Sequence, residues 1–466
     1  MDVEKTLGAL SLAGLMGLQL ALTVGLTACG QTMKSSANSA AVSDQCAPSA
    51  IPNRFLVQWK DGTTSVEEAE DESAFQKKVL GPNQDKIIFA EHDFKVTIEH
   101  PLAAHTTGNM AGQMAGQMGY SADAATPMLS PSLQVASTWG QTDVDAADAW
   151  SLATGAGVIV AVVDAGADVT HPQLQNQIAV NSADKPANGI DDEGNGFVDD
   201  TYGYDFAANS GSIHDGTEGH GTHVSGIILA QHGVSANGVT GINGMAPNAQ
   251  LLPLNFMASD GTGDISVALQ AIDYAVKRKA KVINASWGGG CASSLQTKIA
   301  SLAANGVLFV TAAGNGGNNG VGLNLDVSPS YPAAFSIPGQ ITVGAVMQTE
   351  INGAPADVMT GFSNYSTTLV HLMAPGEDIR STFPASGSIC SNGENDGYCE
   401  MSGTSMATPF VSGVAALLFS YRPKATVAQV KAAILAGVTP GNFLTLSGGR
   451  LNAKKALDAL AQAVSQ

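Results

Sequence analysis

The sequence predicts an α/β fold, a three-layer αβα arrangement with a mainly parallel sheet, preceded by a small α+β domain. Short apolar runs bounded by glycine, such as residues 158–163, alternate with stretches of helical spacing, such as residues 265–279. Continuous apolar runs are typical of strands buried on both faces, and their alternation with helices is typical of parallel sheets. The 466 residues, 44% of them hydrophobic, can supply the large core that such a sheet requires.

The chain begins with a segment typical of an export signal. Residues 1–28 are predicted to be a signal peptide, because residues 7–28 are apolar or small and carry no charge. Residues 26–30, Leu-Thr-Ala-Cys-Gly, resemble the lipobox of bacterial lipoproteins, in which the cysteine is lipidated. The first six residues lack the usual net positive charge, so an ordinary secretory signal or a membrane anchor stays open. We expect an exported protein, either a cell-envelope lipoprotein held by lipid on Cys29 or a protein secreted after processing.

Changes in composition divide the rest of the chain into four parts. Residues 29–50 are small and polar and are predicted to be a tether. Residues 51–100 form a small domain of about the minimum size to fold alone. Residues 101–132 contain a repeat of small residues and methionine, typical of a flexible linker and of a cleavage region. The α/β pattern then occupies residues 133–466.

Within the small domain, residues 54–59 alternate like a strand and residues 66–80 are spaced like a charged helix. Residues 87–98 are predicted to form two more short strands. In the large domain, further short apolar runs predict strands at residues 250–255, 282–286, 307–311 and 341–346. Active sites of such sheets lie beyond the carboxyl ends of the strands, which is where functional side chains are expected.

Charge and cysteine content restrict the environment and the partners. The formal net charge of −19 argues against nucleic acid and against an anionic membrane surface as a partner. Cys390 and Cys399 flank a turn-rich loop, so a local disulfide between them is the simplest pairing. If Cys29 carries lipid, Cys46 and Cys291 remain, and the sequence does not assign their partners.

A serine stands at the start of an apolar helix in residues 403–409, Gly-Thr-Ser-Met-Ala-Thr-Pro. Gly403 permits a sharp entry into the turn, and Pro409 lies early in the helix, where a missing N–H is tolerated best. Unsatisfied backbone N–H groups and the positive helix end lie beside Ser405. Such a position suits a nucleophile together with an oxyanion, although an N-cap serine before a core helix is the plain alternative.

Two further segments supply the partners that a serine nucleophile needs. Asp164 ends the apolar run at residues 158–163, and a buried aspartate there is costly unless it is paired. Residues 219–226, Gly-His-Gly-Thr-His-Val-Ser-Gly, open an apolar helix with His220 and His223. The zinc-protease motif requires histidines four apart with an adjacent glutamate, which is absent here. His220 as the base, oriented by Asp164, therefore fits a catalytic triad best.

The chain order Asp, His, Ser and the three segments around these residues resemble the subtilisin-like serine proteases, the subtilases or peptidase S8 family, of bacteria. The resemblance implies that Ser405 attacks the scissile carbonyl, that His220 transfers the proton and that Asp164 orients the imidazole. It also implies that Asn315 and the Ser405 N–H bind the oxyanion, and that His223 is structural. It extends from about residue 133 to the C-terminus through residues 284–289, 312–315, 331–333 and 374–376.

The same resemblance implies how a polypeptide substrate is bound. Extended substrates pair with exposed strand edges, here expected around Gly261 and Gly263 and around Ser286 and Gly288. Trp287 is expected to narrow or floor the P1 pocket, and Ser330 matches the region at its base. Neither position is acidic, so we expect an apolar P1 residue. The small domain is implied to be an inhibitor-like propeptide, a partner that the enzyme itself cuts off.

One acidic loop is a candidate cation site. Residues 188–200 alternate oxygen-bearing side chains at Asp191, Glu193 and Asn195, followed by a glycine and by Asp199. This spacing imitates a calcium loop, although Tyr202 stands where the final glutamate is expected. We expect a structural Ca²⁺, with a solvated acidic turn as the alternative. No cofactor is expected in the chemistry.

These observations predict an exported serine endopeptidase, made as a self-processing precursor. The alternative is a catalytically silent surface binding module on the same fold. An esterase with a Ser-Asp-His triad would require a Gly-x-Ser-x-Gly elbow and another chain order, and Ser405 has neither.

Overall fold

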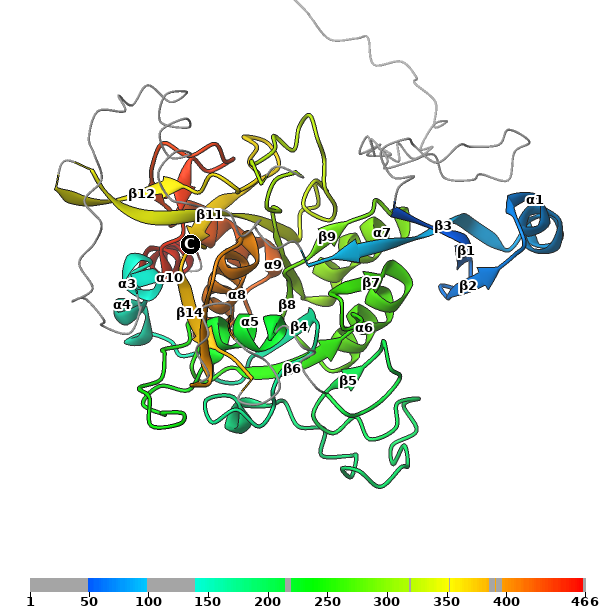
Figure 1. The fold of residues 1–466 in the computed structure, drawn as a ribbon, viewed down its shortest axis with the longest axis horizontal. Coiled ribbons are helices and arrows are strands. Elements are labelled where there is room, and N and C mark those ends of the chain that lie inside the picture. The colour runs from blue at the N-terminus through cyan, green and yellow to red at the C-terminus, as the bar shows by residue number, and fades with distance from the viewer. Residues whose placement is uncertain are drawn as a thin grey trace, which may run out of the picture.

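The computed structural model describes residues 49–98, 139–213, 219–317, 320–351, 353–384, 390 and 396–463. The predicted signal segment, nearly all of the tether and the predicted linker lie outside these residues. Figure 1 shows the described residues as a small N-terminal domain and a larger α/β domain, with the small domain projecting from one side.

A sheet of ten strands forms the middle of the large domain. Its order is β16-β17-β13-β11-β10-β8-β4-β6-β5, with β12 paired to β11. All neighbours in it are parallel except β11 with β12 and β16 with β17, so the predicted mainly parallel sheet is confirmed. The strands are β4 Ile159–Asp164, β5 Tyr204–Asp205, β6 Gln250–Asn255, β8 Val282–Ala285, β10 Leu308–Ala312, β11 Gln340–Ile351, β12 Ala354–Met359, β13 Leu372–Pro375, β16 Thr439–Pro440 and β17 Gly449–Arg450.

Strand β4 positions the site, because the order of the sheet reverses around it. It is the first of these strands in the chain, yet it lies between β6 and β8. Later strands are therefore added on both sides of it. Connections diverge at the carboxyl end of such a strand and leave a crevice there.

Helices cover both faces of the sheet, and the alternation of side chains along β4 shows why. Val160 and Val162 join one buried cluster, whereas Ala161 and Val163 join the other. The first face is covered by α3 Trp139–Asp143, α4 Ala146–Trp150, α5 His220–Leu229, α8 Thr404–Tyr421, α9 Val427–Ala436 and α10 Ala453–Ala463. The second face is covered by α6 Ile265–Lys277 and α7 Ser293–Leu302.

Helix α8 is long and apolar enough to cross a membrane by length and composition, but it is almost wholly buried in the large domain. It packs against α5 and against β8, β10 and β11. We therefore describe it as the central core helix. Because α5 and α8 contact each other, their N-termini can present side chains to the same crevice.

The small domain is a three-stranded antiparallel sheet with the order β2-β1-β3. Its strands are β1 Ala50–Trp59, β2 Thr64–Glu68 and β3 Ile87–Thr97, and its helix α1 Glu72–Phe75 continues as a π-helical segment, Gln76–Leu80. The strand predicted at residues 54–59 lies within β1. The prediction of two short strands at residues 87–98 was wrong, because β3 is one continuous strand.

The helix predicted from residue 66 begins only at Glu72. Residues 66–68 pair with β1 instead, and Asp71 ends this extended stretch by accepting a hydrogen bond from the Ala74 N–H. This N-cap prevents the helix from extending towards the N-terminus. The helical spacing of residues 66–68 therefore does not lead to a helix there.

A two-stranded ribbon of β14 Ile379–Thr382 and β15 Tyr398–Met401 packs near α5. Cys390 and Cys399 form a disulfide beside it, which confirms the predicted local pairing. The disulfide closes the turn-rich loop that leads into β15.

Candidate active site

Asp164 and His220 form a buried pair at the carboxyl end of β4. Asp164 is fully buried, and its Oδ1 accepts hydrogen bonds from His220 Nδ1 at 2.8 Å and from the Ala165 N–H at 2.8 Å. Because Nδ1 donates to the carboxylate, Nε2 is the basic nitrogen of the neutral ring. The pair therefore has the tautomer and the orientation of a general base.

Two glycines allow α5 to approach β4 this closely. Gly219 has a positive φ of 64°, which turns the chain into the helix that begins with His220. A Cβ on Gly221 would lie 1.9 Å from Gly166 O and 3.3 Å from Asp164 Oδ1. A side chain at residue 221 would therefore push His220 away from Asp164.

His223, one helical turn further along, has a structural role. It is fully buried, and its Nε2 donates to Ile379 O at 2.9 Å and to Cys399 O at 3.0 Å, which ties α5 to the β14–β15 ribbon. Burial lowers the pKa of His223 to about 3, so the ring is neutral near neutral pH. These contacts agree with the structural role predicted for it.

Ser405 lies in the first turn of α8 and is 3% exposed. Its Oγ donates to Ser286 O at 3.2 Å, and its own carbonyl accepts a hydrogen bond from Ser286 Oγ at 2.9 Å. Asn284 links β8 to α8 through hydrogen bonds with Ser286 and Ser412. The end of β8 thus holds the start of α8, and with it Ser405, in a defined position.

Asn315 lies three residues beyond the end of β10 and is 4% exposed. Its Oδ1 accepts hydrogen bonds from the Thr404 N–H and from Thr404 Oγ1, both at 2.8 Å, and this orients the side-chain amide. A Cβ built on Gly403 would lie 3.4 Å from Asn315 Nδ2 and 3.6 Å from the Ser405 nitrogen. The side-chain amide nitrogen of Asn315 and the backbone nitrogen of Ser405 therefore both lie near Gly403, at the positive end of a long helix.

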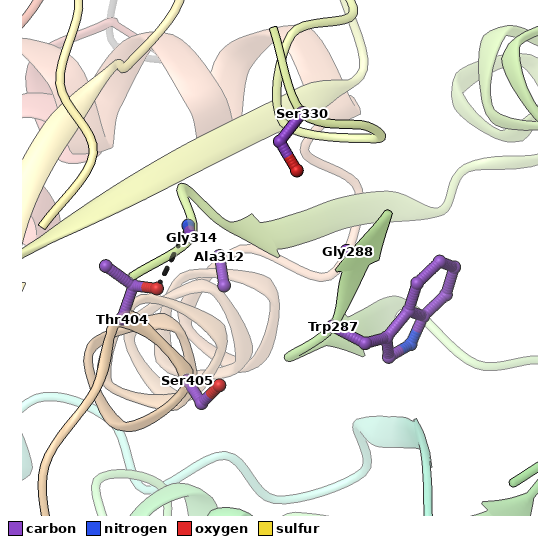
Figure 2. A pocket seen from close by; sticks show the side chains of 7 residues that line it. All are labelled: Trp287, Gly288, Ala312, Gly314, Ser330, Thr404 and Ser405. Carbon is purple, nitrogen blue, oxygen red and sulfur yellow. Dashed lines mark hydrogen bonds between the residues drawn. The ribbon is translucent and has the colours of Figure 1, made fainter. Parts of the chain in front are cut away.

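A shallow depression opens beside Ser405. Figure 2 shows its lining, which is Trp287, Gly288, Ala312, Gly314, Ser330, Thr404 and Ser405. None of these described lining residues has a charged side chain. It brings together four of the residues predicted from sequence, namely Trp287, Gly288, Ser330 and Ser405.

Trp287 borders the depression, but its indole extends away from Ser405 (Figure 2). The indole is 2% exposed, packs against Phe256 with ring centroids 5.0 Å apart and donates from Nε1 to Val163 O. The ring therefore fills the core beneath β4 and β8. It does not form the floor that was one of the two expectations, whereas narrowing of the pocket by Trp287 stays a prediction.

Both predicted substrate edges are paired with strand β3 of the small domain. Val96 and Thr97 are opposite Gly263 and Thr262 of β7 Thr262–Asp264, and the Ile98 N–H donates to Gly261 O at 3.0 Å. On its other side β3 pairs with β9 Gly288–Gly289, so that it is the middle strand of three. Figure 1 shows β3 running from the small domain to β7 and β9.

Two carboxylates of strand β3 itself contact the N-termini of the helices on the second face. Glu91 accepts hydrogen bonds from the Ser293 and Ser294 N–H groups at the start of α7, both at 2.7 Å. Asp93, fully buried, accepts from the N–H and the Oγ of Ser266 at the start of α6. Glu91 and Asp93 were not predicted from the sequence, although their two-residue spacing within a strand places both carboxylates on one face.

The acidic loop holds a group of carboxylates that differs from the predicted one. Ligand oxygens of Asp184, Glu193 and Asp200 all lie within 4.8 Å of one another. Asp191 and Asp199, which were predicted as ligands, accept hydrogen bonds from backbone N–H groups of their own turn instead. These two carboxylates lie outside the group of three, and their role as ligands stays a prediction.

The donor set of this group fits a hard cation. Asp184 Oδ1 and Glu193 Oε2 are buried and have no hydrogen-bond partner among the described residues. Asn195, a third predicted ligand, donates from Nδ2 to Glu193 and Asp200 and so borders the group. Tyr202, at the place where a calcium loop ends, is 41% exposed. Asp184 was missed because it lies outside residues 188–200, and Asp200 was missed because the alternation of Asp191, Glu193 and Asn195 does not reach it.

Comparisons with known proteins agree with this fold. Residues 155–450 match the Subtilase family, and the chain belongs to this family of serine proteases. It is 34% identical to thermitase of Thermoactinomyces vulgaris over 322 residues, which are 68% of this chain and 95% of thermitase.

It is also 34% identical to the major intracellular serine protease of Bacillus subtilis, over 67% of this chain and 86% of that protein. Among solved structures, fervidolysin of Fervidobacterium pennivorans, a keratinolytic enzyme related to subtilisin, superposes with a TM-score of 0.65 and 22% identity. The match covers 88% of this chain and 61% of fervidolysin. At this identity the likeness concerns the fold alone, and it supports the subtilisin-like fold class.

Proposed function

We propose that this chain is an endopeptidase that hydrolyses peptide bonds through a triad of Ser405, His220 and Asp164. The observation that carries the proposal is the buried hydrogen bond between Asp164 and His220, located where α5 meets the helix that begins beside Ser405. Ser405 Oγ attacks the scissile carbonyl while His220 Nε2 takes its proton. The same proton then passes to the leaving amine, and water releases the acyl group from Ser405.

The oxyanion of each tetrahedral intermediate would be bound by Asn315 Nδ2 and the Ser405 N–H. Their common position beside Gly403 supports this assignment, as does the orientation of Asn315 by Thr404. For attack, the Ser405 hydroxyl must turn from Ser286 O towards His220. Catalytic hydrogen bonds often tighten only when substrate is bound, so this rotation belongs to the reaction path.

An extended polypeptide is the proposed substrate. Main-chain pairing with Gly261, Gly263 and Gly288 would give affinity, as it does for β3, and the depression beside Ser405 would receive the P1 side chain. An uncharged lining that includes Ala312 and Gly314 supports an apolar P1 residue. Ser330 and Ser286 would border this subsite.

The test is the substitution Ser405→Ala in the full chain. We expect peptide hydrolysis to fall by on the order of 10⁴-fold or more, the scale found when a triad member is removed from other serine proteases. Ser420→Ala at the far end of the same helix is the matched control and should keep its activity. A wild-type protein that neither cleaves casein nor labels with a fluorophosphonate would instead support the silent binding module.

The N-terminal domain is proposed to be the enzyme's own inhibitory propeptide. Strand β3 covers the edges assigned to substrate, and Phe94, Val96 and Ile98 enter the core cluster of the large domain. Cleavage between residues 98 and 139 would cut the backbone between the two domains and make the chain a self-processing precursor. The Ser405→Ala protein should then remain uncut.

We also propose that Asp184, Glu193 and Asp200 hold a structural Ca²⁺. The unpartnered buried oxygens of Asp184 and Glu193 support this site. The ion would neutralise carboxylates that otherwise repel one another and would take no part in catalysis.

An oxidising location outside the cytoplasm is proposed as well. The Cys390–Cys399 disulfide supports it, because structural disulfides persist mainly in exported proteins. The candidate signal segment and the lipid site on Cys29 would place the precursor at the bacterial cell envelope, with release after processing as the alternative.

A further inference from the structure

Cys291 lies two residues beyond strand β9, at the edge where β3 is bound. It is 5% exposed and takes part in a disulfide. Cys390 and Cys399 are bonded to each other, and the chain has five cysteines in all. The partner of Cys291 within this chain is therefore Cys29 or Cys46, and both precede the small domain.

The position of Ser49, the first described residue, favours Cys46. A Cβ on Gly290, the neighbour of Cys291, would lie 2.9 Å from Ser49 Oγ and 2.6 Å from Phe94 Cβ. The register confirms this approach, since Ala50 pairs with Phe94. The chain therefore passes directly beside residue 290 as it enters β1.

Cys46 precedes Ser49 by three residues, a span of about 11 Å at most. A disulfide requires Cα atoms about 4.4–6.8 Å apart, which so short a segment can provide. Cys29 is 20 residues from Ser49, so its thiol would have to close a much longer loop. We propose that Cys46 and Cys291 form a disulfide that links the segment before the small domain to the substrate-binding edge of the peptidase domain.

This bond changes what processing does, a consequence that rests on the proposed self-processing. Hydrolysis between residues 98 and 139 adds one water to one peptide bond and leaves Cys46 on the N-terminal fragment. Cys291 stays on the peptidase domain. The two fragments remain covalently joined after the cut, and β3 stays tethered beside Gly288 and Gly263.

Tethering keeps the enzyme latent. A short tether gives the bound domain an effective concentration in the millimolar range, so β3 rebinds faster than substrate at ordinary concentrations can replace it. Formation of the bond transfers two electrons and two protons from the thiols to a protein disulfide donor. Reduction of the disulfide, which releases the N-terminal fragment, takes two electrons and two protons from a dithiol reductant. It yields free Cys46 and Cys291 thiols.

The pairing can be tested without any activity, in the uncut Ser405→Ala protein. Free thiols are alkylated, the protein is digested with trypsin without reduction, and the peptides are analysed by mass spectrometry. We expect residues 35–54, which contain Cys46, to be joined to residues 282–298, which contain Cys291. An alkylated Cys291, or Cys291 joined to the peptide that carries Cys29, overturns the proposal. This result does not depend on the proposed function.

The consequence for latency is tested with the wild-type full chain. On gels without reductant we expect one species of full mass, and with dithiothreitol two fragments. Hydrolysis of a small chromogenic peptide should rise about tenfold on reduction, as the tethered inhibitor is lost. Cys46→Ser should yield separate fragments and activity that is insensitive to reductant.

The double variant Cys390→Ser with Cys399→Ser controls for reduction of the local disulfide and should behave like wild type. Fragments of the wild type that separate without reductant contradict the tether. A chain that stays uncut in every lane contradicts the self-processing instead, and the peptide map then still decides the pairing.

Discussion

The small and the large domain bury their side chains in different ways. The large domain fills both faces of its sheet with extensive apolar clusters, whereas the small domain has a core of only four fully buried residues, Phe55, Val57, Phe75 and Ala90. The carboxyl-terminal half of β3 does not serve that small core. Phe94, Val96 and Ile98 belong to a cluster of the large domain.

This difference indicates that the two domains have different roles. A domain with so small a core gains much of its stability from the surface on which it docks. The chemistry should then depend on the large domain alone, while β3 controls only access to it. The predictions below test this difference in roles, and they begin with the largest expected effect.

Asn315→Ala should lower kcat by about 10²–10³-fold, the loss found for subtilisin's own oxyanion-hole asparagine. The reason is that one of the two donors beside Gly403 is removed. Inhibition by the N-terminal fragment should change much less, because Asn315 does not pair with β3. The measurement is steady-state hydrolysis of a chromogenic peptide by the processed enzyme, together with the inhibition constant of the fragment. An unchanged kcat contradicts the assignment of Asn315.

Removal of Ca²⁺ should destabilise the large domain. Binding at about 100 times Kd contributes about 2.7 kcal/mol, so excess chelator should lower Tm by several degrees. The measurement is calorimetry of the processed enzyme with and without calcium.

Two variants separate the observed ligand set from the one predicted from sequence. Asp184→Asn should abolish the calcium-dependent shift in Tm, whereas Asp191→Asn should retain it, since Asp191 binds only its own turn. The opposite pattern would restore the sequence-based ligand set.

Val96→Ala should weaken the binding of the small domain by about 1.5 kcal/mol, roughly tenfold, because two buried carbon atoms of a fully buried side chain are lost. Thr97→Ala is the matched control, since the Thr97 side chain is exposed and its loss should change little. The measurement is the inhibition constant of the fragment under reducing conditions. Equal constants for the two variants would mean that backbone pairing alone holds β3.

The smallest effect expected is a pH dependence of the large domain. Burial, with Asp357 nearby, raises the pKa of Asp143 to about 7 against the opposing effect of Arg450. Since the folded pKa lies above the usual 3.8, the stabilisation by this group is present below that value and is lost as pH rises through 7.

Tm of the processed enzyme should therefore fall between pH 6 and pH 8 by an amount equivalent to about 1 kcal/mol or less. Asp143→Asn should flatten this part of the profile, because its side chain cannot ionise. A profile that is equally steep in the variant would assign the titration to another group.

Local signals explain why the triad could be predicted. Asp164 ends a β-branched run, His220 follows a glycine that turns into a helix, and Ser405 follows Gly403. Each of these features is set by a few neighbouring residues, and the parallel sheet then brings the carboxyl ends of its strands together. The fold class was predicted for the same reason.

The predictions that were wrong concern features that depend on residues distant in the sequence. The helix predicted from residue 66 begins at Glu72, because pairing of residues 66–68 with β1 overrides helical spacing. The indole of Trp287 fills the core between Phe256 and Val163, since its direction follows from neighbours that are distant in sequence. Neither outcome can be derived from spacing alone.

The sequence by itself determined the sheet, the three segments that we propose to be catalytic and the local disulfide, because these depend on burial periodicity and on turns within a few residues. Only the tertiary structure decided which carboxylates face one another. Asp199, with a positive φ of 57°, binds its own turn, while Asp184 and Asp200 approach Glu193. It also decided that β3 lies on the substrate edges and that Ser49 lies beside Gly290. Contacts of this kind join residues more than two hundred positions apart in the case of Ser49 and Gly290, and no local preference encodes them.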